Sequence, residues 1–247
     1  MRQLPHGSLH VAERRRPTLW SYCIPYDDGA APNPYWGVCT LAICKPAIRR
    51  TAQVGDWVVG TGSKQSPIGD ISGMVVYAMR VSQTLTMAEY DVLTRRTLTQ
   101  KVPVWTHRDH RRRLGDSIYD FETDPPTQRL GVHPEGYRST DLSGLKVLLS
   151  DHFYYFGDNP QPLPDELLPI VRQGQGHQSL MNAPYVDAFT VWIASLGLPP
   201  NAPRGKPQLD LFKDAGTVAV CAEACMKDDL EDEWLAHLSA TKSQRRQ

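Results

Sequence analysis

The sequence reads Val54-Gly-Asp-Trp-Val-Val-Gly-Thr-Gly-Ser63, a Gly-Asp turn that leads into a short apolar run. Gly and Asp favour tight turns, and a run rich in Val and Trp is typical of a buried strand. A loop with Pro67 and Gly69 follows, and then Gly73-Met-Val-Val-Tyr-Ala-Met-Arg-Val81 gives the clearest strand signal of the chain. We therefore predict strands at residues 57–60 and 73–81.

Strands are also predicted on both sides of this region, at residues 18–24, 37–44 and 145–150. All of these segments are short, and turns or irregular loops join most of them instead of regular helical crossovers. This pattern favours an α+β fold over a doubly wound sheet. We expect a mainly antiparallel, partly barrel-like sheet with peripheral helices.

Two helices are predicted from their end signals. Thr86 and Glu89 form a Thr-x-x-Glu capping box, which predicts a helix to about residue 96. Asn182 is the predicted cap of a second helix, which is expected to end at Gly197. We divide the chain into a flexible N-terminal arm, one domain, and a C-terminal extension that holds a strand near residues 217–221 and an acidic helix. The three segments are residues 1–17, 18–197 and 198–247.

Composition excludes several classes of protein. The 247 residues include 27 basic and 27 acidic side chains, so the formal net charge is zero and whole-protein charge gives no strong affinity for nucleic acid. Five cysteines in scattered positions argue against a secreted disulfide scaffold. No apolar run reaches the roughly 18–20 residues that span a bilayer. Residues 1–16 have no apolar segment typical of a secretory signal. A soluble cytoplasmic protein is expected.

The loop between the first two predicted strands is rich in aromatic and polar residues. Aromatic rings can stack on a planar base, while Asp or Asn can bind its edge. The alternative is a structural loop, in which Asp28 and Gly29 form a turn and Asn33 bonds to the backbone. The two interpretations are equally supported. The residues concerned are Tyr22, Tyr26, Asp27, Asp28, Asn33, Tyr35 and Trp36.

The Gly-rich end of the next strand is a candidate anion site. Backbone N–H groups at Thr61 and Gly62, with Ser63 and Lys64 nearby, can hold one anionic group. The spacing differs from that of a nucleoside triphosphate loop, because no Gly-Lys-Ser/Thr and no helix follow. The alternative is a strand end at which glycines allow positive φ.

Candidate acid–base groups follow later in the chain. His152 and Tyr154 come after a predicted strand, and His177 lies in the Gly-rich turn that ends at Ser179. His and Tyr are also common at the edge of a core, and for His152 and Tyr154 that alternative is favoured.

Basic and metal-ligand residues give weaker signals. Arg111–Arg113 beside Trp105 could contact phosphates, although a solvated basic loop is commoner. His107 with His110, and Cys221 with Cys225, do not have convincing ligand spacing, so we predict no metal site and identify no cofactor. Cys39 and Cys44 flank an apolar strand and look buried, which gives weak support to a thiol nucleophile.

A set of short segments spread over about residues 18–197 carries a joint signal. These segments are Ser21-Tyr22, Asp28–Pro34, Gly37–Ala42, Cys44–Pro46, Arg49-Arg50, Val54–Ser63, Val76–Met79, Gly115–Tyr119, Leu149–Gly157 and Gly174–Ser179 with Asn182. Together they resemble the nucleotide modification associated domain family, type two, whose members occur in phages and bacteria near genes for DNA-base hypermodification. A looser resemblance links the strands at 57–60 and 73–81 to PUA-like barrels, which include the EVE and ASCH base-binding domains.

The resemblance implies a setting in DNA base modification and a nucleotide or nucleic acid as partner, with DNA favoured over RNA. We therefore predict a nucleotide- or nucleobase-binding protein and, if it is an enzyme, a transferase or hydrolase that acts on a base or a glycosidic bond. The predicted catalytic residues are His152, Tyr154, His177 and Asp28. The predicted binding residues are Tyr22, Asn33, Trp36, Thr61, Gly62, Ser63, Lys64, Ser179 and Asn182.

Two alternatives stay open. One is a PUA-like reader that binds modified nucleic acid without turnover, and the other is a structural protein that binds a partner through its acidic C-terminal helix. Either base-directed function requires residues 22–36, 60–63, 152–154 and 177 to meet at one cleft.

Overall fold

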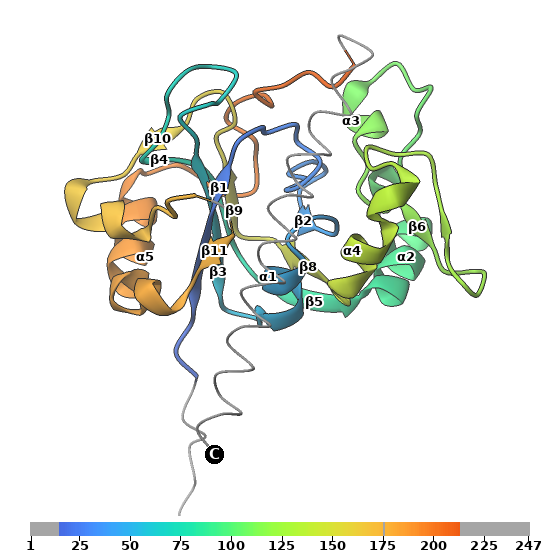
Figure 1. Cartoon of the computed structure of the whole chain (residues 1–247), viewed down its shortest axis with the longest axis horizontal. Coiled ribbons are helices and arrows are strands. Elements are labelled where there is room, and N and C mark those ends of the chain that lie inside the picture. Colours follow the sequence, from blue (N-terminus) through green and yellow to red (C-terminus); the bar gives the residue numbers. More distant parts are fainter. Residues whose placement is uncertain (1–14, 175, 213–247) are drawn as a thin grey trace, which may run out of the picture.

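The structure is a computed structural model and describes residues 15–174 and 176–212. The predicted strand at residues 217–221 and the acidic helix lie outside the described residues. Within the described ranges the chain folds into two main sheets with helices on both sides (Figure 1). The strands are β1 Leu19–Ile24, β2 Cys39–Leu41, β3 Trp57–Gly62, β4 Met74–Arg80, β5 Gln83–Thr86, β6 Tyr119–Asp120, β7 Thr127–Gln128, β8 Lys146–Ser150, β9 Phe153–Tyr155, β10 Gln161–Pro162 and β11 His177–Gln178.

The helices in the described part of the chain are short, and the 3₁₀ segments have three or six residues each. The α-helices are α1 Pro46–Thr51, α2 Met87–Arg96, α3 His110–Arg113, α4 Arg138–Ser143 and α5 Val186–Ser195. The 3₁₀ segments are η1 Thr99–Lys101, η2 Glu135–Tyr137, η3 Asp165–Ile170 and η4 Leu180–Tyr185.

The larger sheet has the order β10-β4-β3-β1-β11, and β9 also pairs with β4. A smaller sheet has the order β2-β8-β5, and β6 pairs with β7. Strands β1 and β3 run parallel, with Leu19 opposite Trp57 and Ile24 opposite Gly62, whereas the other strand pairs are antiparallel. The α+β class and the mostly antiparallel pairing are therefore confirmed, and neither sheet closes into a barrel.

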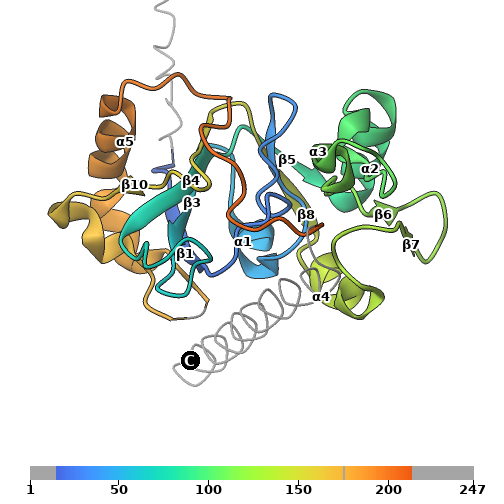
Figure 2. The same ribbon diagram turned by 90° about the horizontal axis from the view of Figure 1, so that it is seen from above.

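The two strands predicted from the opening stretch are the centre of the larger sheet. Strand β3 is buried along its whole length, and β4 is buried from Val75 to Met79. Alternate side chains of β3 face two different cores: Val58 packs toward the smaller sheet, and Val59 packs toward Phe189 of α5. In both views α5 covers one side of the molecule, and α2, α4 and β6 lie on the opposite side (Figures 1 and 2).

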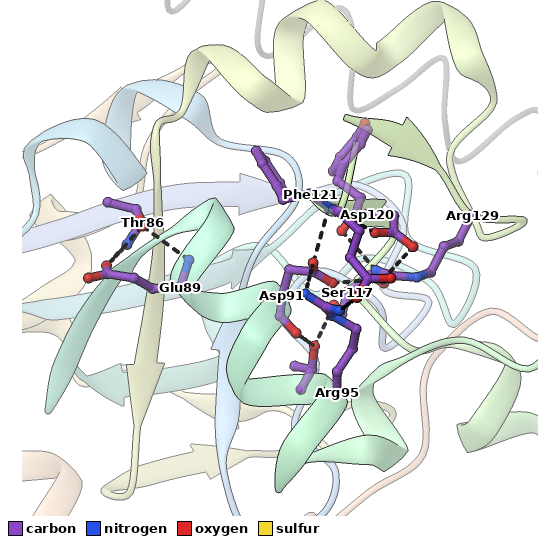
Figure 3. Close-up of polar contacts among 11 residues, drawn as sticks. Thr86, Glu89, Asp91, Arg95, Ser117, Asp120, Phe121 and Arg129 are labelled. Carbon is purple, nitrogen blue, oxygen red and sulfur yellow. Dashed lines mark hydrogen bonds and ion pairs between the residues drawn. The ribbon is translucent and has the colours of Figure 1, made fainter. Parts of the chain in front are cut away.

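Helix α2 begins as the sequence predicts. The Thr86 hydroxyl accepts a hydrogen bond from Glu89 N, and Glu89 in turn accepts one from Thr86 N. Further along the helix, the buried Asp91 carboxylate accepts a hydrogen bond from Arg129 Nη2 at 2.7 Å and another from the backbone N–H of Phe121 at 3.0 Å (Figure 3). These contacts fix the irregular segment after α3 against α2.

The second predicted helix differs at its start. Residues 180–185 form the 3₁₀ segment η4, and α5 begins only at Val186, with Tyr185 before it. The prediction that Asn182 caps this helix is wrong, because its buried amide group donates instead to Leu19 O at 2.9 Å and to Ser21 Oγ at 2.8 Å. Asn182 thus ties η4 to β1.

Residues 201–212 form backbone hydrogen bonds to β9 and to the loop that follows β1. Asn201 N and Arg204 N donate to the backbone of β9, and Leu209 N donates to Asp27 O at 3.0 Å. The predicted division after residue 197 stays a prediction.

No helix among the described residues is long and apolar enough to cross a bilayer.

Candidate functional site

The aromatic loop between β1 and β2 returns through a strained turn. Asn33 and Thr40 form an antiparallel bridge, and the turn between them contains Trp36 at φ 69° and Gly37 at φ 77°. A bulky residue with positive φ is uncommon and is found where the surrounding structure holds it. The turn presents the Trp36 side chain toward α3.

The buried side chain of Lys101 holds both ends of this turn. Lys101 Nζ lies 2.7–3.0 Å from four oxygens of Asn33, Val38 and Thr40, which share its three N–H donors. Burial lowers the pKa of Lys101 to about 8. Asn33 is itself fully buried and donates Nδ2 to Leu114 O at 2.8 Å. The structure therefore places Asn33 inside the support of the loop.

Asp27 is the buried carboxyl group of the loop. It accepts hydrogen bonds from the Tyr155 hydroxyl at 2.7 Å and from Gly29 N at 3.3 Å, and burial raises its pKa to about 7. Asp28 is half-buried and accepts from Ala30 N at 2.8 Å, which is the Asx turn that the alternative interpretation predicts.

Aromatic and arginine side chains gather where the loop meets α3. The Arg111 guanidinium lies 5.0 Å from the centre of the Trp36 ring, and the Arg113 guanidinium lies 3.8 Å from that of Phe212. Trp105 packs against Phe212 with ring centres 5.1 Å apart. We call this group the Trp36–Arg111 surface. It consists of Tyr35, Trp36, Trp105, Arg111, Arg113 and Phe212.

The Trp36–Arg111 surface holds several hydrogen-bond donors without partners. Within the described ranges, five enclosed side-chain nitrogen or oxygen atoms lack a hydrogen bond, and three of them are Tyr35 OH, Trp36 Nε1 and Arg113 Nε. Burial raises the pKa of Tyr35 far above its usual value, so its hydroxyl keeps the proton that it can donate. Enclosed donors without acceptors are rare in native proteins, and each calls for a specific explanation.

A second group of predicted residues meets at β1, on the other side of the core. Tyr22 pairs with His177 of β11 and with Gly60 of β3, and its hydroxyl lies 2.8 Å from the Tyr77 hydroxyl. Thr61 donates to Tyr22 O at 3.2 Å. Gly62 leaves no room for a side chain, since a Cβ there would lie 2.4 Å from Ile71 O. Ser63 and Lys64 follow at the end of β3, and Ser179 and Asn182 lie next to β11.

His152 and Tyr154 lie at the opposite end of β3. The His152 ring packs edge-on against Trp57, the first residue of β3, at 5.7 Å. Burial and the nearby Arg80 lower the pKa of His152. The structure thus brings together residues of β1, β11 and the end of β3, namely Tyr22, Thr61, Gly62, Ser63 and His177. His152 and Tyr154 lie together near Trp57, at the start of β3. The Trp36 turn of the aromatic loop lies at a third place, against α3. The four stretches do not meet at one cleft.

Sequence reasoning missed the contact between Trp36 and Arg111. Trp36 was a predicted binding residue and Arg111 belonged to a candidate phosphate-binding cluster, but no local pattern relates two residues so far apart in sequence. The positive φ of Trp36 also had no signal, because only the following Gly37 has a residue type typical of that conformation. Among the described residues, no three His, Cys, Asp or Glu side chains form a group that could hold a metal ion.

Comparison with known proteins adds one result. A family model described as nucleotide modification associated domain 2 matches residues 16–215. The chain belongs to this family. No curated protein and no solved structure gives a significant match. As a member of the nucleotide modification associated domain 2 family, the chain is associated with nucleotide modification. The matched range includes the aromatic loop, α3 and the segment that ends at Phe212.

Proposed function

We propose that this protein binds a nucleotide, as a free molecule or within DNA, through the Trp36–Arg111 surface. The observation that carries the proposal is the half-exposed Arg111 guanidinium over the Trp36 ring, with Arg113 over Phe212 on the same helix and enclosed donors of Tyr35, Trp36 and Arg113 that lack a partner beside them. Nucleotides supply what these groups lack, since phosphate and base oxygens accept hydrogen bonds and the base is planar.

Exposure and charge also support binding here. The Arg111 side chain is 48% exposed, and its partner Asp109 is the N-cap residue of α3, the short helix that contains Arg111. A guanidinium that already lies over an indole can stack on a base and contact a phosphate at the same time. The hydrogen bonds from Arg111 lower the pKa of Asp109 to about 2, so Asp109 is a carboxylate at neutral pH and orients the Arg111 side chain through their ion pair.

The test is a binding titration with the four deoxynucleoside monophosphates and with a single-stranded oligodeoxynucleotide of about ten nucleotides. Arg111→Ala is expected to weaken binding about tenfold or more, because a stacking contact contributes about 1–3 kcal/mol per base. Trp36→Leu is expected to weaken it similarly.

Arg108→Ala is the matched control. Arg108 is exposed on the same segment and has the same charge, but in the described structure it makes no arginine–aromatic contact. If Arg108→Ala weakens binding as much as Arg111→Ala, only general charge matters and the proposal is wrong. Absence of binding to every probe would refute it as well.

The residues that meet at β1 stay predictions for base binding, and His152, Tyr154, His177 and Asp28 stay predictions for acid–base catalysis. A transferase or hydrolase and a reader without turnover both fit the proposed binding, so the distinction depends on finding a catalytic group.

A further inference from the structure

A cysteine, a histidine and an aspartate that do not belong to the Trp36–Arg111 surface meet in the interior. Cys44 Sγ lies 3.3 Å from His133 Nε2, and His133 Nδ1 lies 2.7 Å from Asp141 Oδ2. The three residues come from the segment before α1, the segment before η2, and α4. A nucleophile beside a base that a third group orients is the arrangement used in covalent catalysis.

The hydrogen bonds of Asp141 determine how the His133 ring is protonated. Burial alone would raise the pKa of Asp141, but the charges of His133 and Arg49 and several hydrogen bonds bring it below its usual value. As a carboxylate, Asp141 accepts from His133 Nδ1 and also from the Tyr119 hydroxyl at 2.7 Å. Nδ1 therefore carries a proton in either charge state of the ring, and in the neutral ring the unprotonated Nε2 faces the Cys44 thiol as its base.

The backbone at Cys44 is held in a strained form. Cys44 has φ 56° and Lys45 has φ 45°, both in the left-handed region that residues with a side chain seldom adopt. Asp141 Oδ1 accepts Cys44 N at 2.9 Å, so one carboxylate holds both the base and the nucleophile's backbone. Strain of this kind clusters at functional sites.

A buried arginine locks the same assembly. Arg49 is fully buried, donates Nε to Cys44 O at 2.7 Å, and also donates to Asp141 O and Lys146 O. Gly144 makes room for it, since a Cβ at Gly144 would lie 2.2 Å from the Arg49 guanidinium carbon. Arg49 and Asp141 are positioning residues for Cys44 and His133.

We propose that Cys44 is the nucleophile of an acyl-transfer reaction, with His133 as its general base. His133 Nε2 takes the thiol proton, and the thiolate adds to the carbonyl carbon of an amide or ester. The carbon–nitrogen or carbon–oxygen bond then breaks, and the amine or alcohol leaves with the proton from His133. Water attacks the thioester, gives a proton back through His133, and releases the acid and the thiol. The proposal does not depend on nucleotide binding at the Trp36–Arg111 surface.

Access is the decisive property, because Cys44 is only 1% exposed and His133 only 6%. The test is to treat the folded full-length chain with iodoacetamide from pH 5.5 to 9 and to measure the labelled peptides by mass spectrometry. Cys39 is the internal control: it is fully buried, and burial raises its pKa to about 12. We expect Cys44 to react at least about tenfold faster than Cys39 at pH 7 and to stay reactive below pH 7.

His133→Gln should reduce the Cys44 labelling rate at pH 7 by about tenfold or more and should shift its pH profile toward that of an ordinary thiol. Labelling of Cys44 only after unfolding in urea, at the rate of Cys39, would show an inert core thiol and overturn the proposal. Should the variant fail to fold, the wild-type comparison of the two cysteines alone gives the same decision.

The acyl step has its own readout. p-Nitrophenyl acetate is expected to transfer an acetyl group to the Cys44 peptide, and hydroxylamine should remove it, as expected for a thioester. Acetylation at other residues only, or none, would refute acyl transfer even where the thiol is reactive. Neither result bears on nucleotide binding, which the Arg111 and Arg108 variants test separately.

Discussion

Asp27 shows how a single buried group can make stability depend on pH. Asp27 is 2% exposed and its carboxyl group has Tyr155 and Gly29 as hydrogen-bond donors, but the cost of burial outweighs them and raises its pKa from 3.8 to about 7. The folded state therefore keeps a proton that the unfolded chain releases between these two values. The stability linked to this proton is fully present below about pH 3.8 and is lost as the pH rises through about 7.

We predict that Asp27→Asn flattens this dependence. Three pKa units correspond to at most about 4 kcal/mol, so the free energy of unfolding of the wild type should fall by up to that amount, relative to the variant, between pH 4 and pH 7.5. Urea unfolding at several pH values measures the difference between the two proteins, which removes the contributions of Lys101 and other shared groups. Parallel pH profiles for wild type and variant would contradict the prediction.

Among the helices and strands, the sequence correctly predicts features that depend on residues close together in the chain. The apolar runs at β3 and β4 and the capping box of α2 involve neighbours in sequence, and the structure contains all three. Asn182 shows the limit of this reasoning. An Asn before a helical pattern is typical of an N-cap, but here its amide group bonds to β1, a contact between distant segments that no local pattern reveals.

The candidate sites illustrate the same limit. Trp36 meets Arg111, and Cys44 meets His133 and Asp141, only because tertiary packing brings separate segments together. The sequence predicts that Cys44, beside an apolar strand, is buried, and the structure confirms this. The sequence does not show that His133 and Asp141 lie beside Cys44. These two residues distinguish a candidate nucleophile from an inert thiol.

The capping box gives a prediction for α2. Thr86→Ala removes the hydroxyl that accepts Glu89 N at 3.1 Å and should lower the free energy of unfolding by about 0.5–2 kcal/mol. Thr97→Ala serves as control, because the Thr97 hydroxyl donates to Leu93 O at the exposed end of the same helix and satisfies no free N–H group. Urea unfolding compares the two variants, and an equal effect of both would mean that the cap does not set the start of α2.

At the scale of the whole molecule, charge is balanced, with 27 basic and 27 acidic residues. A neutral protein has no long-range attraction for a polyanion, so nucleotide binding must depend on a few local contacts. At the Trp36–Arg111 surface these are Arg111, which is already paired with Asp109, and Arg113, which packs on Phe212. Salt should therefore have a small effect on binding.

This expectation can be measured as the slope of the logarithm of the binding constant against the logarithm of NaCl concentration. Two phosphate contacts to single-stranded DNA give a slope of about −1.4, since each contact contributes about −0.7. Arg111→Ala should bring the slope to about −0.7, because one contact is lost. Arg108→Ala should leave it unchanged, because Arg108 lies outside the surface. A slope steeper than about −4 would mean that a broad basic face binds the phosphates, and it would contradict recognition by a few stacked arginines.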